Sequence, residues 1–118
     1  MSKKETMKEL NIQNISQLED ITRQQAAVLA YFTGPGCGVC IVVKPKIVSV
    51  LETRFPKMIF CTIDCEAQAE VAGQFGVHSV PTLVLFFDDK ETHRFARSFS
   101  IGELEQAIER TYHLFFDE

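Results

Sequence analysis

Residues 32–45 have the sequence FTGPGCGVCIVVKP, which passes from backbone-breaking residues directly into an apolar run. The stretch holds two of the chain's four cysteines, three of its six glycines and two of its four prolines. The cysteines, Cys37 and Cys40, are three positions apart. A disulfide staple, a metal site, a redox centre and chance all fit that spacing, so the flanking segments must decide among them.

Strand and helix patterns alternate around this stretch. Residues 27–32, AVLAYF, form a short apolar run that is typical of a buried strand. Apolar residues at every third or fourth position predict a helix over residues 38–54, which Pro45 should kink because proline lacks an N–H group. Two further strands are predicted over residues 58–63, MIFCTI, and 82–87, TLVLFF.

The segments between and after these strands complete the pattern. A helix over residues 66–75 is predicted to end at Gly76. A short turn then leads into residues 90–97, whose charged side chains indicate an exposed edge strand. An extended segment near residues 10–12 would add a fifth strand.

Two helix starts carry the capping-box pattern, in which a serine and a glutamate three residues later bond to each other's backbone. Ser16 and Glu19 predict one start, and Ser100 and Glu103 predict the start of a C-terminal helix. The apolar residues of that last helix form one stripe, made of Ile101, Leu104, Ile108, Tyr112 and Phe115.

This order of segments predicts an α/β fold with a mixed central sheet of four or five strands and helices on both faces. The strands at 27–32 and 58–63 should be parallel because a helix connects them, and the last two should be antiparallel because a short turn does. Repeats, low-complexity tracts and linkers are absent from the sequence. Residues 1–118 are therefore expected to form a single domain.

The composition narrows the function classes. A chain of 118 residues with 46% hydrophobic and 24% charged residues is typical of a globular domain. A net charge of −4, with no basic cluster beyond Lys3 and Lys4, argues against nucleic acid or an anionic membrane as partner. The apolar runs are far shorter than the ~18 residues of a membrane span. Because residues 1–16 have no apolar signal region, a cytoplasmic location is expected, where paired cysteines are more often catalytic or metal-binding than structural.

The predicted strand-to-helix junction gives the two cysteines different environments. Residues three apart on a helix are neighbours at about 5–6 Å between Cβ atoms, and a slightly tightened first turn allows a disulfide. At the start of the helix, free N–H groups and the helix dipole favour a thiolate, so the pKa of Cys37 should be lowered. Cys40 lies one turn inside the helix, in a more apolar setting, and should stay a thiol until it reacts.

With these features the sequence resembles the thioredoxin family over nearly its whole length. The matching parts are AVLAYFTGPGCGVC, Pro45, TIDCEAQAEVAGQFGVHSVPTLVLFF and the closing amphipathic helix. The strongest match after CGVC is GVHSVPT. The resemblance implies a thioredoxin fold with a cis peptide bond between Val80 and Pro81, a proline that faces the dithiol, and a Val80 backbone that binds an extended substrate segment.

The resemblance also implies thiol–disulfide exchange, in which Cys37 attacks a substrate disulfide and Cys40 then releases the reduced substrate. The implied enzyme is a cytoplasmic protein-disulfide reductase that is monomeric and needs no metal or organic cofactor. Its partners would be protein disulfides, and thioredoxin reductase or a low-molecular-weight thiol as electron donor.

The sequence departs from the family pattern around the cysteines. Typical members have WCGPC, whereas this chain has GCGVC and contains no tryptophan. Substrate binding is therefore expected to depend on Gly36, Gly38 and Val39. The buried aspartate of many members is replaced by Tyr31, which is a poor base at neutral pH, and Phe60 falls near the expected place of the lysine that usually accompanies it.

Other interpretations stay open at this point. The rival function is a thioredoxin-fold redox sensor, adaptor or metal-binding module without efficient turnover. Cys61 is predicted to be a small buried hydrophobic residue. Cys65 follows the strand at 58–63, at the edge of the sheet that carries function in α/β proteins, and is either a secondary thiol or an inert packing residue. Four thiolates together would suit zinc or an iron–sulfur cluster, although Cys61 should point into the sheet.

Overall fold

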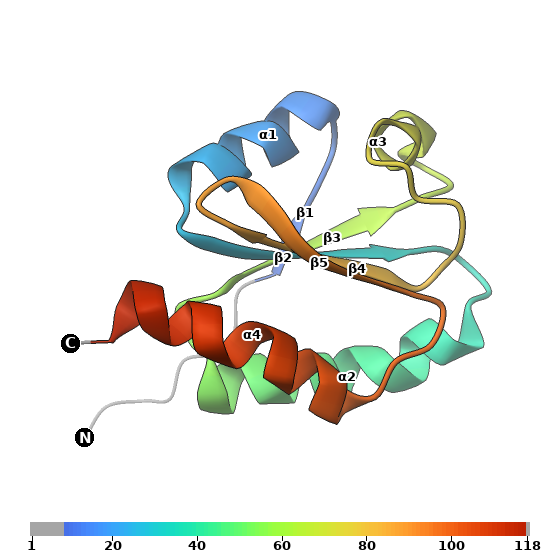
Figure 1. The fold of residues 1–118 in the computed structure, drawn as a ribbon. Coiled ribbons are helices and arrows are strands. Elements are labelled where there is room, and N and C mark those ends of the chain that lie inside the picture. Colours follow the sequence, from blue (N-terminus) through green and yellow to red (C-terminus); the bar gives the residue numbers. More distant parts are fainter. Residues whose placement is uncertain (1–8, 118) are drawn as a thin grey trace, which may run out of the picture.

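The computed structural model describes residues 9–117, so Lys3 and Lys4 lie outside the described part. Five strands form one sheet in the order β1-β3-β2-β4-β5, with helices on both sides (Figure 1). The elements are β1 Glu9–Asn11, α1 Ile15–Gln24, β2 Ala27–Thr33, α2 Gly38–Arg54, β3 Ile59–Asp64, α3 Ala69–Gln74, β4 Thr82–Phe87, β5 Lys90–Ala96 and α4 Ile101–Phe116.

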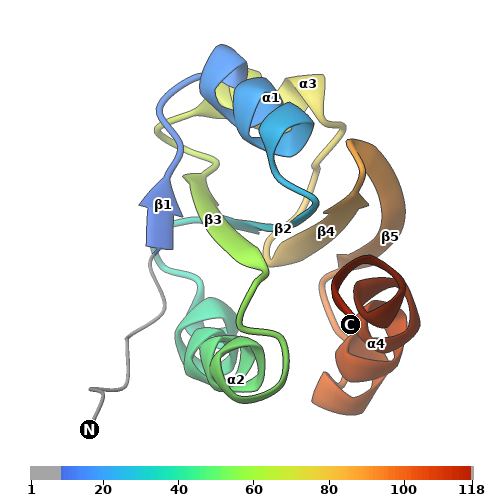
Figure 2. The ribbon, with the colours of Figure 1, turned by 90° about the vertical axis from the view of Figure 1, so that its left-hand side faces the viewer.

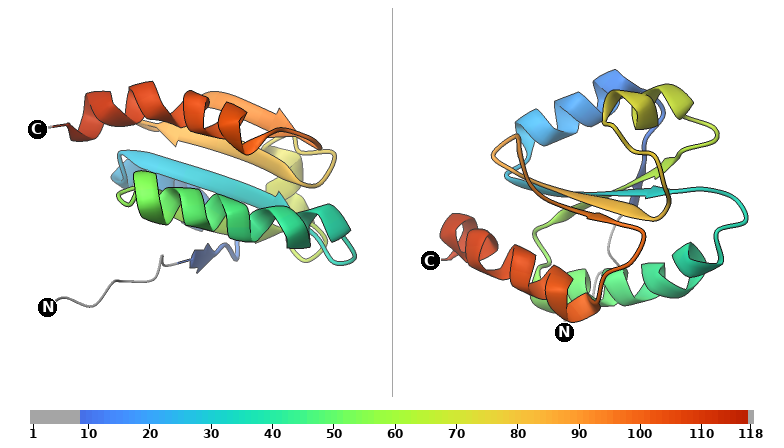
Figure 3. Two further views of the ribbon diagram at one scale, coloured as in Figure 1. Left: turned by 90° about the horizontal axis from the view of Figure 1, so that it is seen from below. Right: turned by 45° about the vertical axis from the view of Figure 1, so that its right-hand side comes forward.

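The sheet is mixed, which confirms the predicted fold class. Strands β1 and β2 run parallel to β3, whereas β4 is antiparallel to β2 and β5 is antiparallel to β4. The early segment does form the fifth strand, at the edge beside β3. Helices α1 and α3 cover one face of the sheet, and α2 and α4 cover the other (Figures 2 and 3).

Strand β2 lies at the centre of the sheet and is buried on both faces. Leu29 and Tyr31 pack in the core beneath α2 and α4, while Val28 and Phe32 pack in the core beneath α1 and α3. All four side chains have no exposed surface. Burial on both faces explains why AVLAYF is almost continuously apolar, and it anchors the residues that follow β2.

Helix α1 begins earlier than the sequence predicted. Asn14 is its N-cap, and the Gln17 N–H donates to Asn14 Oδ1 at 2.8 Å. The Gln17 side chain in turn accepts a hydrogen bond from the Gln13 N–H at 2.6 Å. The prediction that Ser16 and Glu19 start this helix was wrong, because asparagine is an equally good N-cap and precedes Ser16 in the chain.

Helix α4 begins as predicted. The Glu103 N–H donates to Ser100 Oγ at 3.0 Å, and the Ser100 N–H donates to Glu103 Oε1 at 2.9 Å. The predicted apolar stripe is correct as far as Tyr112, but Phe115 is 44% exposed and Phe116 packs against the core instead.

Helix α3 is shorter than the predicted segment 66–75. The Asp64 carboxylate accepts hydrogen bonds from the N–H groups of Glu66 and Ala67 at 2.9 and 3.1 Å, and this turn delays the helix until Ala69. Gly76 follows the helix with φ of +66°, a left-handed conformation that glycine adopts without strain. Within residues 9–117, no helix is both long and apolar enough to cross a membrane.

Candidate active site

The two predicted reactive cysteines lie where β2 leads into α2. Cys37 is the N-cap of α2 and is half-buried, whereas Cys40 lies in the first turn and is 4% exposed. They form a disulfide, with their Cα atoms 5.3 Å apart. The Cys40 N–H donates to Cys37 Sγ at 3.2 Å, so the start of the helix supplies a hydrogen bond to the sulfur that was predicted to ionise.

Gly36 and Gly38 place backbone without side chains on either side of Cys37. Gly36 has φ of +77°, which a residue with a side chain rarely adopts, so the backbone itself requires glycine there. At both Gly36 and Gly38, an added Cβ would meet no described atom within 4 Å apart from those of the adjoining residues and, at Gly38, of the helix's own backbone. Cys37 is therefore bordered by bare backbone rather than covered by a large side chain.

The second predicted motif, at Val80 and Pro81, lies at the same end of the sheet. The antiparallel register pairs Phe32 with Thr82, so the chain leaves β2 and enters β4 at the same end of the sheet. Val80 and Cys37 are half-buried and pack against the same core cluster, and the Val80–Pro81 peptide bond is cis, as the resemblance implied. The Thr82 hydroxyl donates to the Ser79 carbonyl at 2.7 Å and ties this loop to the strand.

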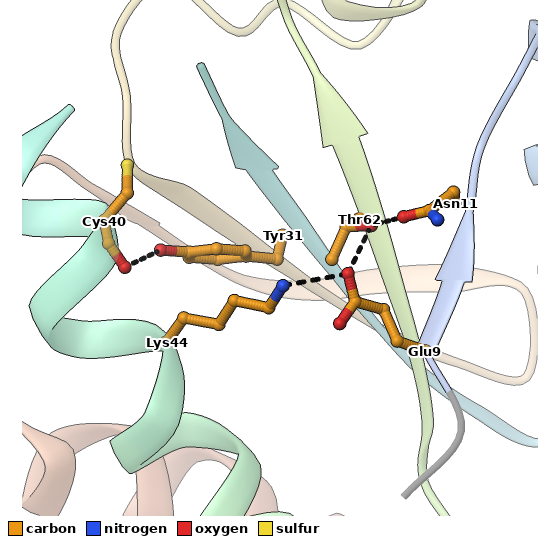
Figure 4. A network of polar contacts seen from close by, with 6 residues as sticks. All are labelled: Glu9, Asn11, Tyr31, Cys40, Lys44 and Thr62. Carbon is orange, nitrogen blue, oxygen red and sulfur yellow. Dashed lines mark hydrogen bonds and ion pairs between the residues drawn. The ribbon is translucent and has the colours of Figure 1, made fainter. Parts of the chain in front are cut away.

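Tyr31 lies directly beneath the first turn of α2. Its hydroxyl donates to the Cys40 carbonyl at 3.0 Å, and its side chain has no exposed surface (Figure 4). Burial raises the pKa of Tyr31 to about 12, so the phenol stays protonated at neutral pH and cannot accept a proton from a cysteine. Tyr31 is thus a positioning residue that fixes the backbone of the helix start.

Two residues of β3 lie beside Tyr31. Thr62 pairs with Tyr31 across β2 and β3. Phe60 packs on the Tyr31 ring, with ring centroids 6.0 Å apart, so it does lie near this position as expected. A threonine hydroxyl and a phenylalanine ring therefore take the space near the tyrosine.

A polar network, which sequence reasoning missed, extends from this position to the edge of the sheet (Figure 4). Lys44 Nζ on α2 lies 2.9 Å from Glu9 Oε2 on β1. The Thr62 hydroxyl donates to the same carboxylate oxygen at 3.1 Å and lies 2.6 Å from Asn11 Oδ1. The one sequence signal for this network is that Lys44 follows Cys40 by four residues, which is the spacing of neighbours on one helix face.

A hollow of about 310 Å³ lies beside the disulfide. Its lining includes Tyr31, Gly36, Cys37, Cys40, Ile41 and Lys44. A second hollow, of about 370 Å³, lies beside the loop that precedes β4. Its lining includes Cys65, Ala69, Ala72, Gly73 and Val80. This end of the sheet therefore has one hollow next to each of the two predicted motifs.

An exposed apolar patch lies on the first turns of α2. It consists of Val39, Ile41 and Val42, whose exposed fractions are 58%, 74% and 61%. The sequence pointed to Val39 because it lies between the cysteines, but it gave no signal for the other two. The start of α2 therefore presents apolar side chains to solvent next to Cys37.

The sheet separates the four cysteines into two groups. Cys37 and Cys40 belong to the core beneath α2 and α4, whereas Cys61 and Cys65 belong to the core beneath α1 and α3. The four thiols therefore do not converge on one centre. Within residues 9–117, no group of three or more histidine, cysteine, aspartate or glutamate residues is placed to hold a metal ion.

Burial keeps both remaining thiols protonated. Cys61 has no exposed surface, and burial raises its pKa to about 12. Burial also raises the pKa of the half-buried Cys65, and the negative charge of Asp64 raises it further. Neither residue has the helix-start hydrogen bond that Cys37 receives, so both favour the unreactive thiol.

Comparison with known proteins identifies the family. The family model for thioredoxin matches residues 6–110. The chain belongs to the thioredoxin family. This thioredoxin-family protein is 37% identical over 113 residues to the thioredoxin-like protein YdfQ of Bacillus subtilis, an alignment that covers 95% of this chain and 100% of YdfQ. It is also 32% identical over 102 residues to thioredoxin C-3 of Corynebacterium nephridii, covering 86% of this chain and 68% of that protein.

Solved structures agree with this assignment. A mutant thioredoxin from Halobacterium salinarum has a TM-score of 0.81 and 27% sequence identity, covering 94% of this chain and 96% of its own. The fold and the Cys37–Cys40 pair together make this thioredoxin-family protein a thioredoxin-like oxidoreductase with a CxxC disulfide.

Proposed function

We propose that this protein is a cytoplasmic protein-disulfide reductase with Cys37 as nucleophile and Cys40 as resolving thiol. The observation that carries the proposal is the asymmetry of the two sulfurs at the start of α2. Cys37 is partly exposed and accepts a backbone N–H hydrogen bond on Sγ, while Cys40 is almost fully buried. One sulfur is thus accessible and stabilised as an anion, and the other is shielded until a partner has bound.

The reaction begins with the reduced dithiol. The Cys37 thiolate attacks one sulfur of a substrate disulfide, and the other substrate sulfur leaves as a thiolate and takes up a proton. Cys40 then loses its proton and attacks Cys37 Sγ, which breaks the mixed disulfide and forms the Cys37–Cys40 bond. Two electrons pass from the dithiol to the substrate. The thiols carry these electrons themselves, so the exchange uses no metal or organic cofactor.

The proposed substrate surface surrounds Cys37. It includes Gly36, Gly38 and Val39 on one side and Val80 with Pro81 on the other. Because β4 begins at Thr82, the Val80 backbone lies outside the sheet ladder, where an extended substrate segment can pair with it. The exposed side chains of Ile41 and Val42 continue this surface along α2 and favour substrates with apolar residues near the disulfide.

The proposal also includes the domain organisation, the oligomeric state and the partners of the protein. Residues 1–118 form a single domain that works as a monomer on protein disulfides. Thioredoxin reductase or a low-molecular-weight thiol returns the Cys37–Cys40 disulfide to the dithiol. Neither nucleic acid nor a membrane is a partner, as a net charge of −4 favours, and Cys65 takes no step in the reaction.

The decisive experiment traps the mixed disulfide. A Cys40→Ser variant is mixed with a disulfide substrate and analysed by mass spectrometry, and the unaltered protein is assayed for insulin reduction with dithiothreitol as electron source. The proposal expects a stable adduct on Cys37 and accelerated insulin reduction. An adduct without turnover would favour the redox-sensing alternative, and the absence of both would overturn the assignment of Cys37 as nucleophile.

A further inference from the structure

The hollow beside the disulfide is lined by a basic side chain, Lys44, as well as by the two cysteines. Of the described residues that line it, Lys44 is the one with a basic side chain. Lys44 follows Cys40 by one helical turn, and both residues line the hollow. A cation that shares a hollow with two thiols favours their thiolate forms.

The charge of Lys44 is opposed by a carboxylate from a different element. Glu9 Oε2 lies 2.9 Å from Lys44 Nζ, and the two side chains are 32% and 39% exposed. Thr62, which is 7% exposed, donates to the same oxygen and fixes the carboxylate at the edge of the sheet. The pair is therefore partly shielded from water, which strengthens the effect of each charge on its surroundings.

The other ionisable groups near the dithiol are less suited to act on it. Tyr31, from β2, is neutral because burial raises its pKa to about 12. Asp64 ends β3 and His78 lies in the loop before β4, and both are exposed to solvent, which screens them. On α4, Glu103 bonds to its own helix cap at Ser100. Lys44 is thus the charged group that lines this hollow, and Glu9 is its ion-pair partner.

We propose that Lys44 and Glu9 act as a charge pair that sets how readily the reduced cysteines ionise. Lys44 favours the thiolate, and Glu9 limits that effect by neutralising Lys44. The proposal rests on the thiol–disulfide exchange assigned to Cys37 and Cys40. Both charged residues are positioning residues, because they act on the sulfurs through the local electric field and do not contact the substrate.

The pair matters most when the mixed disulfide is resolved. At that step Cys40 S–H gives its proton to water, the resulting thiolate attacks Cys37 Sγ, and the substrate sulfur leaves with the bonding electrons and is then protonated. With Tyr31 unable to accept a proton, this anion needs stabilisation from a nearby cation. Lys44 supplies it from the next turn of α2.

The test measures ionisation directly, in the absence of substrate. The reduced protein is alkylated with iodoacetamide over a series of pH values, and mass spectrometry follows Cys37 and Cys40 separately. Lys44→Met is expected to move the midpoint of the profile to higher pH, and Glu9→Gln to lower pH. Each shift should be about half a pH unit, the size expected for one charge acting through partly solvated protein.

Three further variants make the outcome specific. The double variant Glu9→Gln/Lys44→Met should return close to the unaltered midpoint, because both opposing charges are gone. Lys44→Arg should keep the unaltered midpoint, because the charge remains. Arg54→Met is the matched control, since Arg54 is 40% exposed and forms ion pairs with Glu105 and Glu109 at the far end of the same helix. It should leave the midpoint unchanged.

Opposite shifts in the two single variants would support the proposal. Unmoved midpoints, or shifts in the same direction, would overturn it, because loss of a merely structural ion pair affects both variants alike. Thermal unfolding shows which variants are folded. If Lys44→Met does not fold, the midpoints of Glu9→Gln and Lys44→Arg still test the proposal. Alkylation needs no substrate, so this result is separate from trapping of the mixed disulfide, and either experiment can fail alone.

Discussion

Two neighbouring connections at the same end of the sheet each present a cysteine, and they give its sulfur different surroundings. The connection from β2 to α2 places Cys37 at the N-cap of a 17-residue helix, where the Cys40 N–H contacts its sulfur. The connection from β3 to α3 places Cys65 in a turn before a six-residue helix, next to the carboxylate of Asp64. From this difference we expect the reactivity of each thiol to depend on its backbone donors and neighbouring charges rather than on its place on the sheet.

The largest expected effect comes from removing one sulfur from each connection. Cys37→Ser should reduce the rate of insulin reduction by about 10³-fold or more, because a serine hydroxyl is not ionised at neutral pH and cannot form the mixed disulfide. Cys65→Ser should leave that rate within about twofold, because Cys65 takes no step in the exchange. Equal losses in both variants would remove the distinction between the two connections.

Alkaline pH should lower the free energy of unfolding, because Cys61 and Tyr31 are buried in their protonated forms. Cys61 and Tyr31 have pKa values raised from 9.0 and 10.0 to about 12 in both cases, so the folded state favours their protonated forms. Their contribution to the free energy of unfolding is complete below the unfolded pKa values and is lost as pH rises toward 12. The loss should be roughly 1 kcal/mol or more between those limits, measured by urea unfolding at a series of pH values.

A Cys61→Ala variant provides the control for this pH dependence. It should be less stable than the unaltered protein at neutral pH because of the cavity, yet its stability should fall less steeply above pH 9, the ordinary pKa of a thiol. A slope unchanged by the substitution would mean that Cys61 does not contribute to alkaline unfolding.

The two glycines beside Cys37 should respond differently to alanine. Gly36→Ala should lower the free energy of unfolding by about 1–2 kcal/mol, because Gly36 has φ of +77°. Gly38→Ala should change it by less than about 0.5 kcal/mol, because Gly38 is helical and an added Cβ meets no described atom within 4 Å beyond the adjoining residues and the helix's own backbone. Chemical denaturation of both variants would check this, and equal destabilisation would contradict it.

The smallest expected effect concerns the charge that Asp64 places next to Cys65. Asp64→Asn keeps the side-chain oxygen that accepts from Glu66 and Ala67 but removes the negative charge that raises the pKa of Cys65. Alkylation of Cys65 should then begin at a lower pH, while burial still keeps it less reactive than Cys37. An unchanged Cys65 profile would leave burial as the sole cause of its raised pKa.

The sequence was sufficient for features that depend on local patterns. The apolar run at β2, the spacing of Cys37 and Cys40 and the capping box at Ser100 are each contained in a few consecutive residues, and the structure has all three. Local patterns fail where two of them compete. Asn14 and Ser16 are both good N-caps, and only the folded chain decides between them.

Features that join distant segments could not be predicted in the same way. The Tyr31 hydroxyl reaches the Cys40 carbonyl only because the face of β2 and the start of α2 are fixed by the whole core. Glu9 and Lys44 are 35 residues apart, and their contact requires β1 to add to the edge of the sheet. The exposure of Ile41 depends on which side of α2 meets the sheet, and an almost wholly apolar helix start does not reveal that.

The empty space around Gly38 has a consequence for protein engineering. This position lies between Cys37 and Cys40, has ordinary helical backbone and accepts a Cβ that meets no described atom within 4 Å beyond the adjoining residues and the helix's own backbone. A library of side chains at this one position would therefore vary the face presented to incoming proteins while leaving the core unchanged. If Cys37 and Cys40 exchange disulfides as proposed, Gly38 is a neighbouring position at which new selectivity can evolve at little cost to the fold.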